Sequence, residues 1–396
     1  MRVTLSVIKA DVGSVGGHTM PSAAMVGRAK QLVADAVKKG LLLDGMVTYT
    51  GDDIALIMSH QHGTAAAPVH NFAWDVFLQA TAIARSEGNY GAGQDLLVDA
   101  PSGNVRGAGP AVAEISFELL PKHRPAEAFM VFAADKCAPG AYNLPLYLSF
   151  CDPMHNGGLL LSPVLHKGFT VTVIDMDHRG KEDRVIKLNI PEQVWDLAAL
   201  IRDEDRFAIE AIHSRVHPDE QIVSVAATRL HNVAGKYTGK DDPVALVRVQ
   251  SLFPAPEELV EPWATIHQIV TGDCRGSHNM PIMPTAINQA VTGPYCLPIV
   301  SSLGFSLNKE GKFSSNYVDF FGGEAFDYVR HKVQEKAVDF RRQGFFGVAM
   351  ASKTELAYTG LTDTLTALDK KFEMRRDDAA VSKESRKASK DAKDPD

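Results

Sequence analysis

The stretch RVTLSVIKAD, residues 2–11, indicates the fold class of this chain. Val3, Leu5 and Val7 are apolar and alternate with polar side chains, the period of two that marks a β-strand with one buried face. The same alternation returns in AVAEISFEL, residues 111–119. Because strands of this kind bury one face against another layer and turn the other toward helices or water, we expect layered sheets.

Beyond these strands, apolar residues repeat with a helical period in some segments and with a strand-like period in others. Residues 21–39 repeat apolar side chains every three or four positions, open with Pro21 and end before Gly40, as an amphipathic helix does. The segment 273–298 is expected to be irregular, because its Met-Pro and Gly-Pro pairs forbid a continuous helix. Further strands are expected at 46–49, 54–58, 128–134, 169–176, 222–229 and 244–251, and further helices at 70–87, 191–213 and 324–343.

The glycine-rich loop after the first strand lacks the signature of a dinucleotide-binding fold. Residues 12–17, VGSVGG, have neither the G-x-G-x-x-G spacing nor the acidic partner about 20 positions further on. No P-loop lysine follows this loop. The sequence therefore predicts a sheet-rich α/β chain (α+β, layered) of the sandwich type.

Composition excludes several classes of protein. The 396 residues are 45% hydrophobic and 22% charged, and 41 Lys and Arg against 48 Asp and Glu give a net charge of −7, which argues against a nucleic-acid surface. Apolar runs stop short of the roughly 20 residues of a membrane helix. Four scattered cysteines suggest neither a zinc site nor a disulfide framework. We expect a cytoplasmic protein without nucleic-acid or membrane partners, and a polar, disordered tail at 376–396.

Acidic residues gather at the ends of predicted strands. Asp11 ends the first strand, Asp135 ends a later one, and the pair Asp52-Asp53 follows the second. Two adjacent anions are costly to hold together unless a cation or solvent screens them, so a metal and a solvated turn are equal alternatives for the pair. Asp11 and His18 bracket the glycine loop, where a capping Asp beside a surface His would look the same.

A second acidic pair lies in GKYTGKDDP, residues 235–243, at the start of another predicted strand. Many hard oxygen ligands suit Mg²⁺ rather than zinc, and a cluster of Mg²⁺ ions would most naturally clamp phosphate oxygens and activate water. Lys240 can form a Schiff base with a carbonyl substrate only when it is deprotonated, whereas its neighbours Asp241 and Asp242 favour the ammonium form. Tyr237 can relay a proton. A charged surface turn remains the alternative.

These segments belong to an ordered set of short motifs. In chain order they are D-x6-H at 11–18, TGDD at 50–53, NYGAGQD at 89–95, SGN at 102–104, ADK at 134–136, YTGKDD at 237–242 and RGSH at 275–278. In this set the chain resembles the bifunctional fructose-1,6-bisphosphate aldolase/phosphatase family over roughly residues 2–360. The resemblance implies a four-layer α-β-β-α sandwich with a single catalytic domain at 1–375, assembled as a homo-octamer that serves gluconeogenesis.

The resemblance also implies a reaction and a set of site residues. One site condenses dihydroxyacetone phosphate with glyceraldehyde 3-phosphate and then, with several Mg²⁺ ions, removes the 1-phosphate to give fructose 6-phosphate. Lys240 would be the Schiff-base lysine, Tyr237 the aldolase proton donor and acceptor, and Asp11 the general base that activates water. The implied Mg²⁺ ligands are Asp11, His18, Asp52, Asp53, Gln94, Asp135, Asp241 and Asp242. The implied substrate contacts are His18, Tyr90, Gly103, Asn104, Lys136, Gln250, Arg275 and Tyr358.

Two other functions are weighed against this one. A Mg²⁺-dependent sugar-bisphosphate phosphatase could lack the aldolase step, although Lys240 and Tyr237 speak against that. A catalytically silent sugar-phosphate-binding protein could hold structural Mg²⁺ on the same acids. The run at 59–63, SHQHG, mimics a metal site, but we expect His60 and His62 to be solvated in a polar loop.

Overall fold

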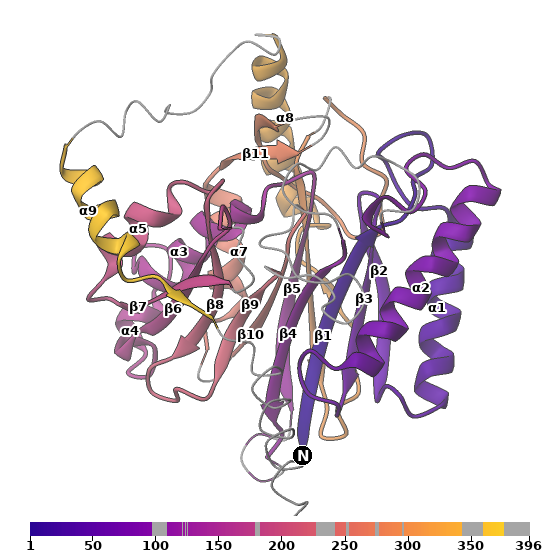
Figure 1. Cartoon of the computed structure of the whole chain (residues 1–396), viewed down its shortest axis with the longest axis horizontal. Helices are drawn as coiled ribbons and strands as arrows, with labels where there is room; N and C mark the ends of the chain where they lie inside the picture. Colours follow the sequence, from indigo (N-terminus) through magenta and orange to yellow (C-terminus); the bar gives the residue numbers. More distant parts are fainter. Residues whose placement is uncertain are drawn as a thin grey trace, which may run out of the picture.

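Two sheets form the centre of the computed structural model (Figure 1), which describes residues 1–96, 109–120, 122, 124, 126–178, 183–226, 242–250, 253–273, 277–294, 297–342 and 359–375. The smaller sheet has the order β2-β3-β1-β4 and is antiparallel throughout. Its strands are β1 (Arg2–Asp11), β2 (Asp44–Thr50), β3 (Asp53–His60) and β4 (Ala111–Glu118). The four strands predicted in this part of the sequence are confirmed.

The larger sheet has ten strands, in the order β13-β14-β5-β10-β9-β8-β6-β7-β16 with β15 beside β14. They are β5 (Glu127–Asp135), β6 (Phe169–Asp175), β7 (Arg184–Ile190), β8 (Phe207–Ser214), β9 (Gln221–Val225), β10 (Val244–Val249), β13 (Met283–Pro284), β14 (Ile299–Leu307), β15 (Val318–Asp319) and β16 (Glu373–Met374). Only β13 and β14 pair in parallel among these described strands. Two more strands, β11 (Ile269–Asp273) and β12 (Ser277–Pro281), form a separate antiparallel pair.

Helices cover the outer faces of both sheets. In Figure 1, α1 (Ala23–Lys38) and α2 (Ala67–Ser86) lie along the smaller sheet. The helices on the side of the larger sheet include α3 (Asn143–Cys151), α4 (Gly158–Leu161), α5 (Val194–Ile201) and α7 (Pro256–Thr265). The remaining helices are α8 (Asp327–Arg342), α9 (Thr359–Asp369) and the short 3₁₀ turns η1 (Gln94–Leu96), η2 (Pro139–Tyr142), η3 (Leu165–Lys167) and η4 (Glu324–Phe326). None of the helices described has the length and apolar character needed to cross a bilayer.

Three large apolar cores among the described residues separate four layers. Val3, Leu5 and Val7 of β1 pack between the sheets against residues of β4, β5, β10 and β14. The alternate residues Ile8 and Ala10 pack against α1 and α2. A third core joins the larger sheet to α3, α5, α7 and α8. The four-layer α-β-β-α sandwich is confirmed, and the period of two in β1 divides its side chains between two cores.

The prediction of a helix over residues 191–213 is wrong for the second half of that range. Helix α5 ends at Ile201, and β8 begins at Phe207 after a turn rich in charge. Strand β8 pairs with β6 on one side and β9 on the other, so its backbone groups are satisfied by the sheet. Apolar residues in 207–212 fit a helical period as well as a buried strand, and pairing with distant strands decided between them.

Other expectations differ in detail. The segment 273–298 contains no continuous helix among its described residues, as expected, but it does contain the strands β12 and β13. Residues 227–229 of the strand expected at 222–229, and the tail at 376–396, lie outside the described residues. Strands β7 and β14 and helices α3 and α7 were not anticipated from the sequence.

His60 is buried, contrary to the solvated loop expected for it, whereas His62 is exposed. The hydroxyl of Ser6 donates to Glu114 Oε1 at 2.6 Å, so it accepts from Nε2 of His60 at 2.7 Å. Nδ1 of His60 then accepts the backbone N–H of His62 at 3.2 Å. Because both ring nitrogens are satisfied in the neutral form, a second proton has no acceptor. Burial lowers the pKa of His60 from 6.5 to about 4.

We expect this histidine to weaken the fold in mild acid. The unfolded chain binds a proton at His60 below pH 6.5, whereas the folded protein does so only near pH 4, so the free energy of unfolding falls as pH drops through that window. The loss is about 3 kcal/mol. Urea denaturation between pH 7 and 4 should give a shallower decline for His60→Gln than for wild type. The exposed neighbour variant His62→Gln should keep the wild-type slope; equal slopes in all three proteins would contradict the prediction.

Candidate active site

The space between the two sheets changes from apolar to acidic at one end. On β5, Phe129, Val131 and Ala133 face the core between the sheets, and the next residue of the same parity is Asp135. On β1 the same parity leads from Val7 to Asp11. Asp11 is the last residue of β1, the strand that runs upward from the N-terminus in Figure 1.

Five buried aspartates form this acidic cluster: Asp11, Asp52, Asp53, Asp135 and Asp242. Together with His18 they make two groups of possible metal ligands, Asp11-His18-Asp52 and Asp53-Asp135-Asp242. Within each group, one ligand atom from every residue lies within 4.8 Å of the others. The carboxylates come from both sheets, so the packing of the sheets creates the cluster.

Gly51 allows the two sheets to approach at this point. The hairpin between β2 and β3 pairs Thr50 with Asp53, leaving Gly51 and Asp52 as its two-residue turn. Gly51 has φ +56°, and a Cβ atom placed on it would lie 1.7 Å from Oδ2 of Asp135. The turn therefore requires a residue without a side chain.

We expect Gly51→Ala to disturb both stability and the acidic cluster. Gly40→Ala is the matched control, because Gly40 also has a positive φ, +75°, but has open space around its missing Cβ. In urea denaturation, Gly40→Ala should lower the free energy of unfolding by about 1 kcal/mol. Gly51→Ala should lower it by roughly 3 kcal/mol, because it adds the clash with Asp135. A Gly51→Ala protein as stable as the control would show that the turn can move away without cost.

Two buried lysines partly balance the acidic cluster. Nζ of Lys136 donates to Oδ1 of Asp52 at 2.5 Å and to Oδ1 of Asp135 at 2.6 Å. Nζ of Lys9 bonds to Asp53. Burial alone would lower the pKa of Lys136, but the surrounding aspartates, Asp135 first, raise it well above its ordinary value. Lys136 is thus held as a cation.

The carboxylates of the cluster differ in proton affinity. Burial, reinforced by neighbouring carboxylates, raises the pKa of Asp11 and of Asp135 well above the usual range. Burial would also raise the pKa of Asp52, but Lys136 and His18 hold it far below that range. Five carboxyl groups face two ammonium groups in a buried space, so the fully ionised cluster carries excess negative charge. Such a donor set suits divalent cations that prefer oxygen.

The loop conformation that carries these groups is strained. Lys136 and Asp242 have positive φ angles of 62° and 54°, which are rare for residues with a side chain. Reciprocal hydrogen bonds hold the two loops together: the N–H of Cys137 donates to Asp242 Oδ1 at 3.0 Å, and the N–H of Asp242 donates to the carbonyl of Cys137 at 2.7 Å. Strain of this kind is typical of sites whose geometry matters for function.

His18 and Tyr90 lie at the rim of the cluster. Nδ1 of His18 is 3.2 Å from Oδ2 of Asp52, and its ring meets the edge of Tyr90 with centroids 4.8 Å apart. Tyr90 is 43% exposed, so this side of the site is open to a ligand. Gln94 begins η1, directly before Asp95.

Two residues near the cluster were missed in the sequence. Lys9 shares the parity of Val7 and Asp11 on β1, and a lysine at an inward position was the signal that could have found it. Asp95 ends the NYGAGQD motif, and its Oδ2 accepts the backbone N–H of Asp11 at 2.9 Å. Both residues contact the acidic cluster rather than solvent.

Among the described residues, the predicted site residue Gln250 lies outside the acidic cluster. Gln250 follows the last residue of β10, whereas Asp242 precedes the first, so roughly 25 Å of extended chain separates them. Gln250 is exposed and has φ +72°. The remaining predicted residues lie outside the described residues: Gly103, Asn104, Tyr237, Lys240, Asp241, Arg275 and Tyr358.

Comparison with known proteins gives consistent matches along the chain. A family model described as fructose-1,6-bisphosphatase matches residues 2–373. Three similar proteins are each named fructose-1,6-bisphosphate aldolase/phosphatase. The one from Thermus thermophilus is 51% identical over 372 residues, covering 94% of this chain and all of the relative. Those from Ignicoccus hospitalis and Cenarchaeum symbiosum are 42% and 41% identical, covering 95% and 94% of this chain and 94% and 95% of the relatives. The chain therefore belongs to the fructose-1,6-bisphosphatase family.

Proposed function

We propose that this protein is a bifunctional fructose-1,6-bisphosphate aldolase/phosphatase. It condenses dihydroxyacetone phosphate with glyceraldehyde 3-phosphate and then hydrolyses the 1-phosphate of the product to give fructose 6-phosphate. The names of relatives that cover nearly the whole chain support both activities. The observation that carries the proposal is the buried acidic cluster, in which two groups of ligands lie side by side at the end of β1.

Mg²⁺ is the proposed cofactor, with several ions at each site. Carboxylate oxygens in excess over ammonium groups fit Mg²⁺, and the described residues contribute no thiolate to the two ligand groups. The proposed ligands are Asp11, His18, Asp52, Asp53, Gln94, Asp135, Asp241 and Asp242. When bound, the ions supply positive charge to phosphate oxygens and lower the pKa of water.

Three described residues have distinct proposed roles in phosphate release. Asp11 takes the proton of the attacking water, because its carboxylate lies within the same group of ligands as His18 and Asp52. Lys136 is a fixed cation beside Asp52 and Asp135, suited to a substrate phosphate. His18 orients the substrate at the rim together with Tyr90.

The proposed aldolase residues are Lys240 and Tyr237. A Schiff base forms when the Lys240 amine adds to the ketone of dihydroxyacetone phosphate and water leaves. Tyr237 transfers the proton during carbon–carbon bond formation. The other proposed substrate contacts are Gly103, Asn104, Gln250, Arg275 and Tyr358. We further propose one catalytic domain at 1–375 and a cytoplasmic homo-octamer that acts in gluconeogenesis.

One paired assay tests the function. The full-length protein is incubated with dihydroxyacetone phosphate, reduced with borohydride and weighed by mass spectrometry. Phosphate release from fructose 1,6-bisphosphate is followed in parallel with Mg²⁺ or with EDTA. We expect a covalent adduct and Mg²⁺-dependent phosphate release from the same preparation. Phosphate release without an adduct would leave a phosphatase only, and thermal stabilisation by the sugar phosphate without either reaction would identify a binding protein.

A further inference from the structure

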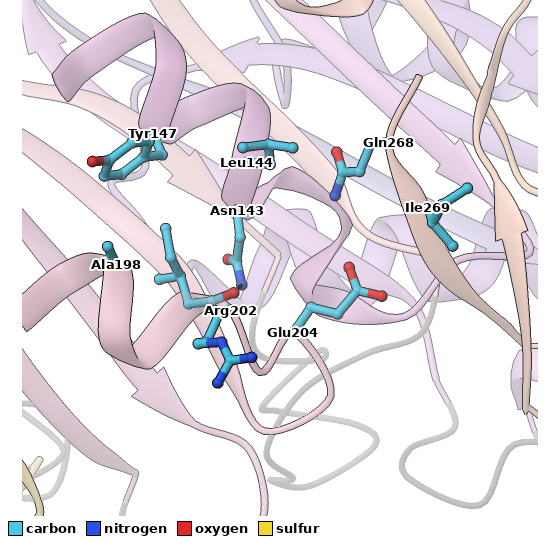
Figure 2. A pocket seen from close by; sticks show the side chains of 9 residues that line it. Asn143, Leu144, Tyr147, Ala198, Arg202, Glu204, Gln268 and Ile269 are labelled. Atoms are coloured by element: carbon cyan, nitrogen blue, oxygen red, sulfur yellow. Dashed lines mark hydrogen bonds between the residues drawn. The ribbon is translucent and has the colours of Figure 1, made fainter. Parts of the chain in front are cut away.

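A pocket lies between α3, the end of α5 and the residues that lead into β11 (Figure 2). Its volume is about 300 Å³, at the small end of the range for small-molecule sites. Leu144, Tyr147, Ala198, Ile201 and Ile269 supply most of its wall. None of the residues proposed for the catalytic site lines this pocket.

Two buried polar side chains face the pocket from one side. Gln268 is 8% exposed, and its Oε1 has no hydrogen-bond partner among the residues that the structure describes. Glu204 is 6% exposed, and its Oε1 accepts the backbone N–H of Thr271 at 2.5 Å. Figure 2 shows the amide of Gln268 and the carboxylate of Glu204 turned toward the same space. A buried acceptor left without a donor costs free energy, so a ligand that donates is favoured there.

Glu204 is also without a counter-charge in the described part of the chain. No ion pair joins it to a lysine, arginine or histidine among the described residues, although other buried carboxylates such as Asp175 have one. Arg202 lines the pocket, but Figure 2 shows its guanidinium turned away from the carboxylate. Burial raises the pKa of Glu204 to about 7, against hydrogen bonds from Thr271 and Gln268 that lower it. A cation in the pocket would compensate the buried charge.

The polar side of the pocket is held in place before any ligand binds. The side chain of Asn143 donates to the carbonyls of Ile201 and Phe207 at 3.1 and 2.7 Å, so its N–H groups are already used. A Cβ atom on Gly140 would lie 2.2 Å from the carbonyl oxygen of Glu204, which shows how closely η2 packs on this turn. The deep polar groups therefore offer acceptors in a fixed arrangement, which favours binding of a complementary donor.

We propose that this pocket binds a small primary ammonium compound, with its head group at the Glu204 carboxylate and the Gln268 amide oxygen and an apolar body against Leu144, Tyr147 and Ile201. An ammonium group has three donors and a positive charge, which match the amide oxygen of Gln268 and the carboxylate of Glu204. At about 300 Å³ the pocket holds a body of roughly ten non-hydrogen atoms, since a water-sized group takes about 30 Å³. The site is independent of the proposed function, and neither stands or falls with the other.

Calorimetric titration of the full-length protein with phenethylamine tests the charge requirement. Phenethyl alcohol and hydrocinnamate are matched probes that keep the aromatic body and replace the ammonium with a neutral or an anionic head. We expect saturable binding of phenethylamine at one site per chain, and at least tenfold weaker binding of both matched probes. Equal binding of the alcohol, or no saturable binding of the amine at millimolar concentration, would overturn the proposal.

Variants locate the binding site. Gln268→Met and Glu204→Gln keep the size of each side chain and should each weaken phenethylamine binding at least tenfold, while Ala198→Phe should abolish it by filling the cavity. Glu192→Gln removes an exposed carboxylate outside the pocket and should bind as wild type does. If Glu204→Gln does not fold, Gln268→Met and Ala198→Phe still test whether the amine binds in this pocket. Wild-type affinity in both of these would place the amine elsewhere and refute the site.

Discussion

Replacing Asp135 with Asn is expected to lower Mg²⁺-dependent phosphate release from fructose 1,6-bisphosphate by roughly a thousandfold. The change keeps the shape of the side chain and an oxygen for Lys136, but removes one anionic ligand from the group formed with Asp53 and Asp242. These carboxylate oxygens would hold the metal ions that stabilise the negative charge on the reacting phosphate. The variant should therefore lower the rate of the hydrolysis step itself. Phosphate release at saturating substrate measures it.

Stability separates this functional loss from misfolding. Burial and neighbouring carboxylates disfavour the charged form of Asp135 more than Lys136 favours it, so Asp135→Asn should melt at the wild-type temperature or above it in EDTA. It should also lose the thermal stabilisation that Mg²⁺ gives to wild type. Low activity together with a lower melting temperature in EDTA would instead indicate a structural role.

Asp175→Asn provides the matched control for Asp135→Asn. Asp175 is equally buried, but it has two arginine partners, Arg184 and Arg206 at 2.8 and 3.1 Å, whereas Asp135 shares Lys136 with Asp52. Three strands separate β6 from β5 in the larger sheet, so Asp175 lies roughly 19 Å or more from Asp135. The control should lose stability and keep its rate of phosphate release at a temperature where it is folded.

Replacing Lys240 with Ala is expected to abolish the borohydride-trapped adduct and the aldol condensation. Only an amine can form the Schiff base with dihydroxyacetone phosphate, and borohydride traps the substrate by reducing that Schiff base. Alanine at position 240 has no amine, so no adduct can form there. Phosphate release from fructose 1,6-bisphosphate should persist, because the acidic cluster is unchanged. Mass spectrometry after reduction, beside the phosphate assay, measures both consequences on one sample.

Lys240→Arg is the matched control for charge. Arginine keeps the positive charge beside Asp241 and Asp242, but its guanidinium stays protonated and cannot act as the nucleophile. It should therefore also lack the adduct, while keeping phosphate release closer to wild type than Lys240→Ala does. An adduct of undiminished yield in either variant would assign the Schiff base to another lysine and remove Lys240 from the proposed mechanism.

Local periodicity was enough to determine much of the framework. The alternation in residues 2–11 and 111–119 became β1 and β4, and the amphipathic period after Pro21 became α1. These patterns are reliable because each face of a strand or helix meets a single environment along its length. The same local pattern also indicated that Asp11, Asp53 and Asp135 stand at strand ends, the feature from which a metal site was predicted.

Only the tertiary structure decided which strands are neighbours, and several functional details depend on that. Strand β8 took the place of a predicted helix because β6 and β9 pair with it. Lys9 became a partner of Asp53 because β1 lies beside β3. Gly51 became essential because the two sheets meet at Asp135. Pairing between residues far apart in sequence leaves no periodic signal in either segment, so a sequence can identify the inward face of a strand without identifying what it faces.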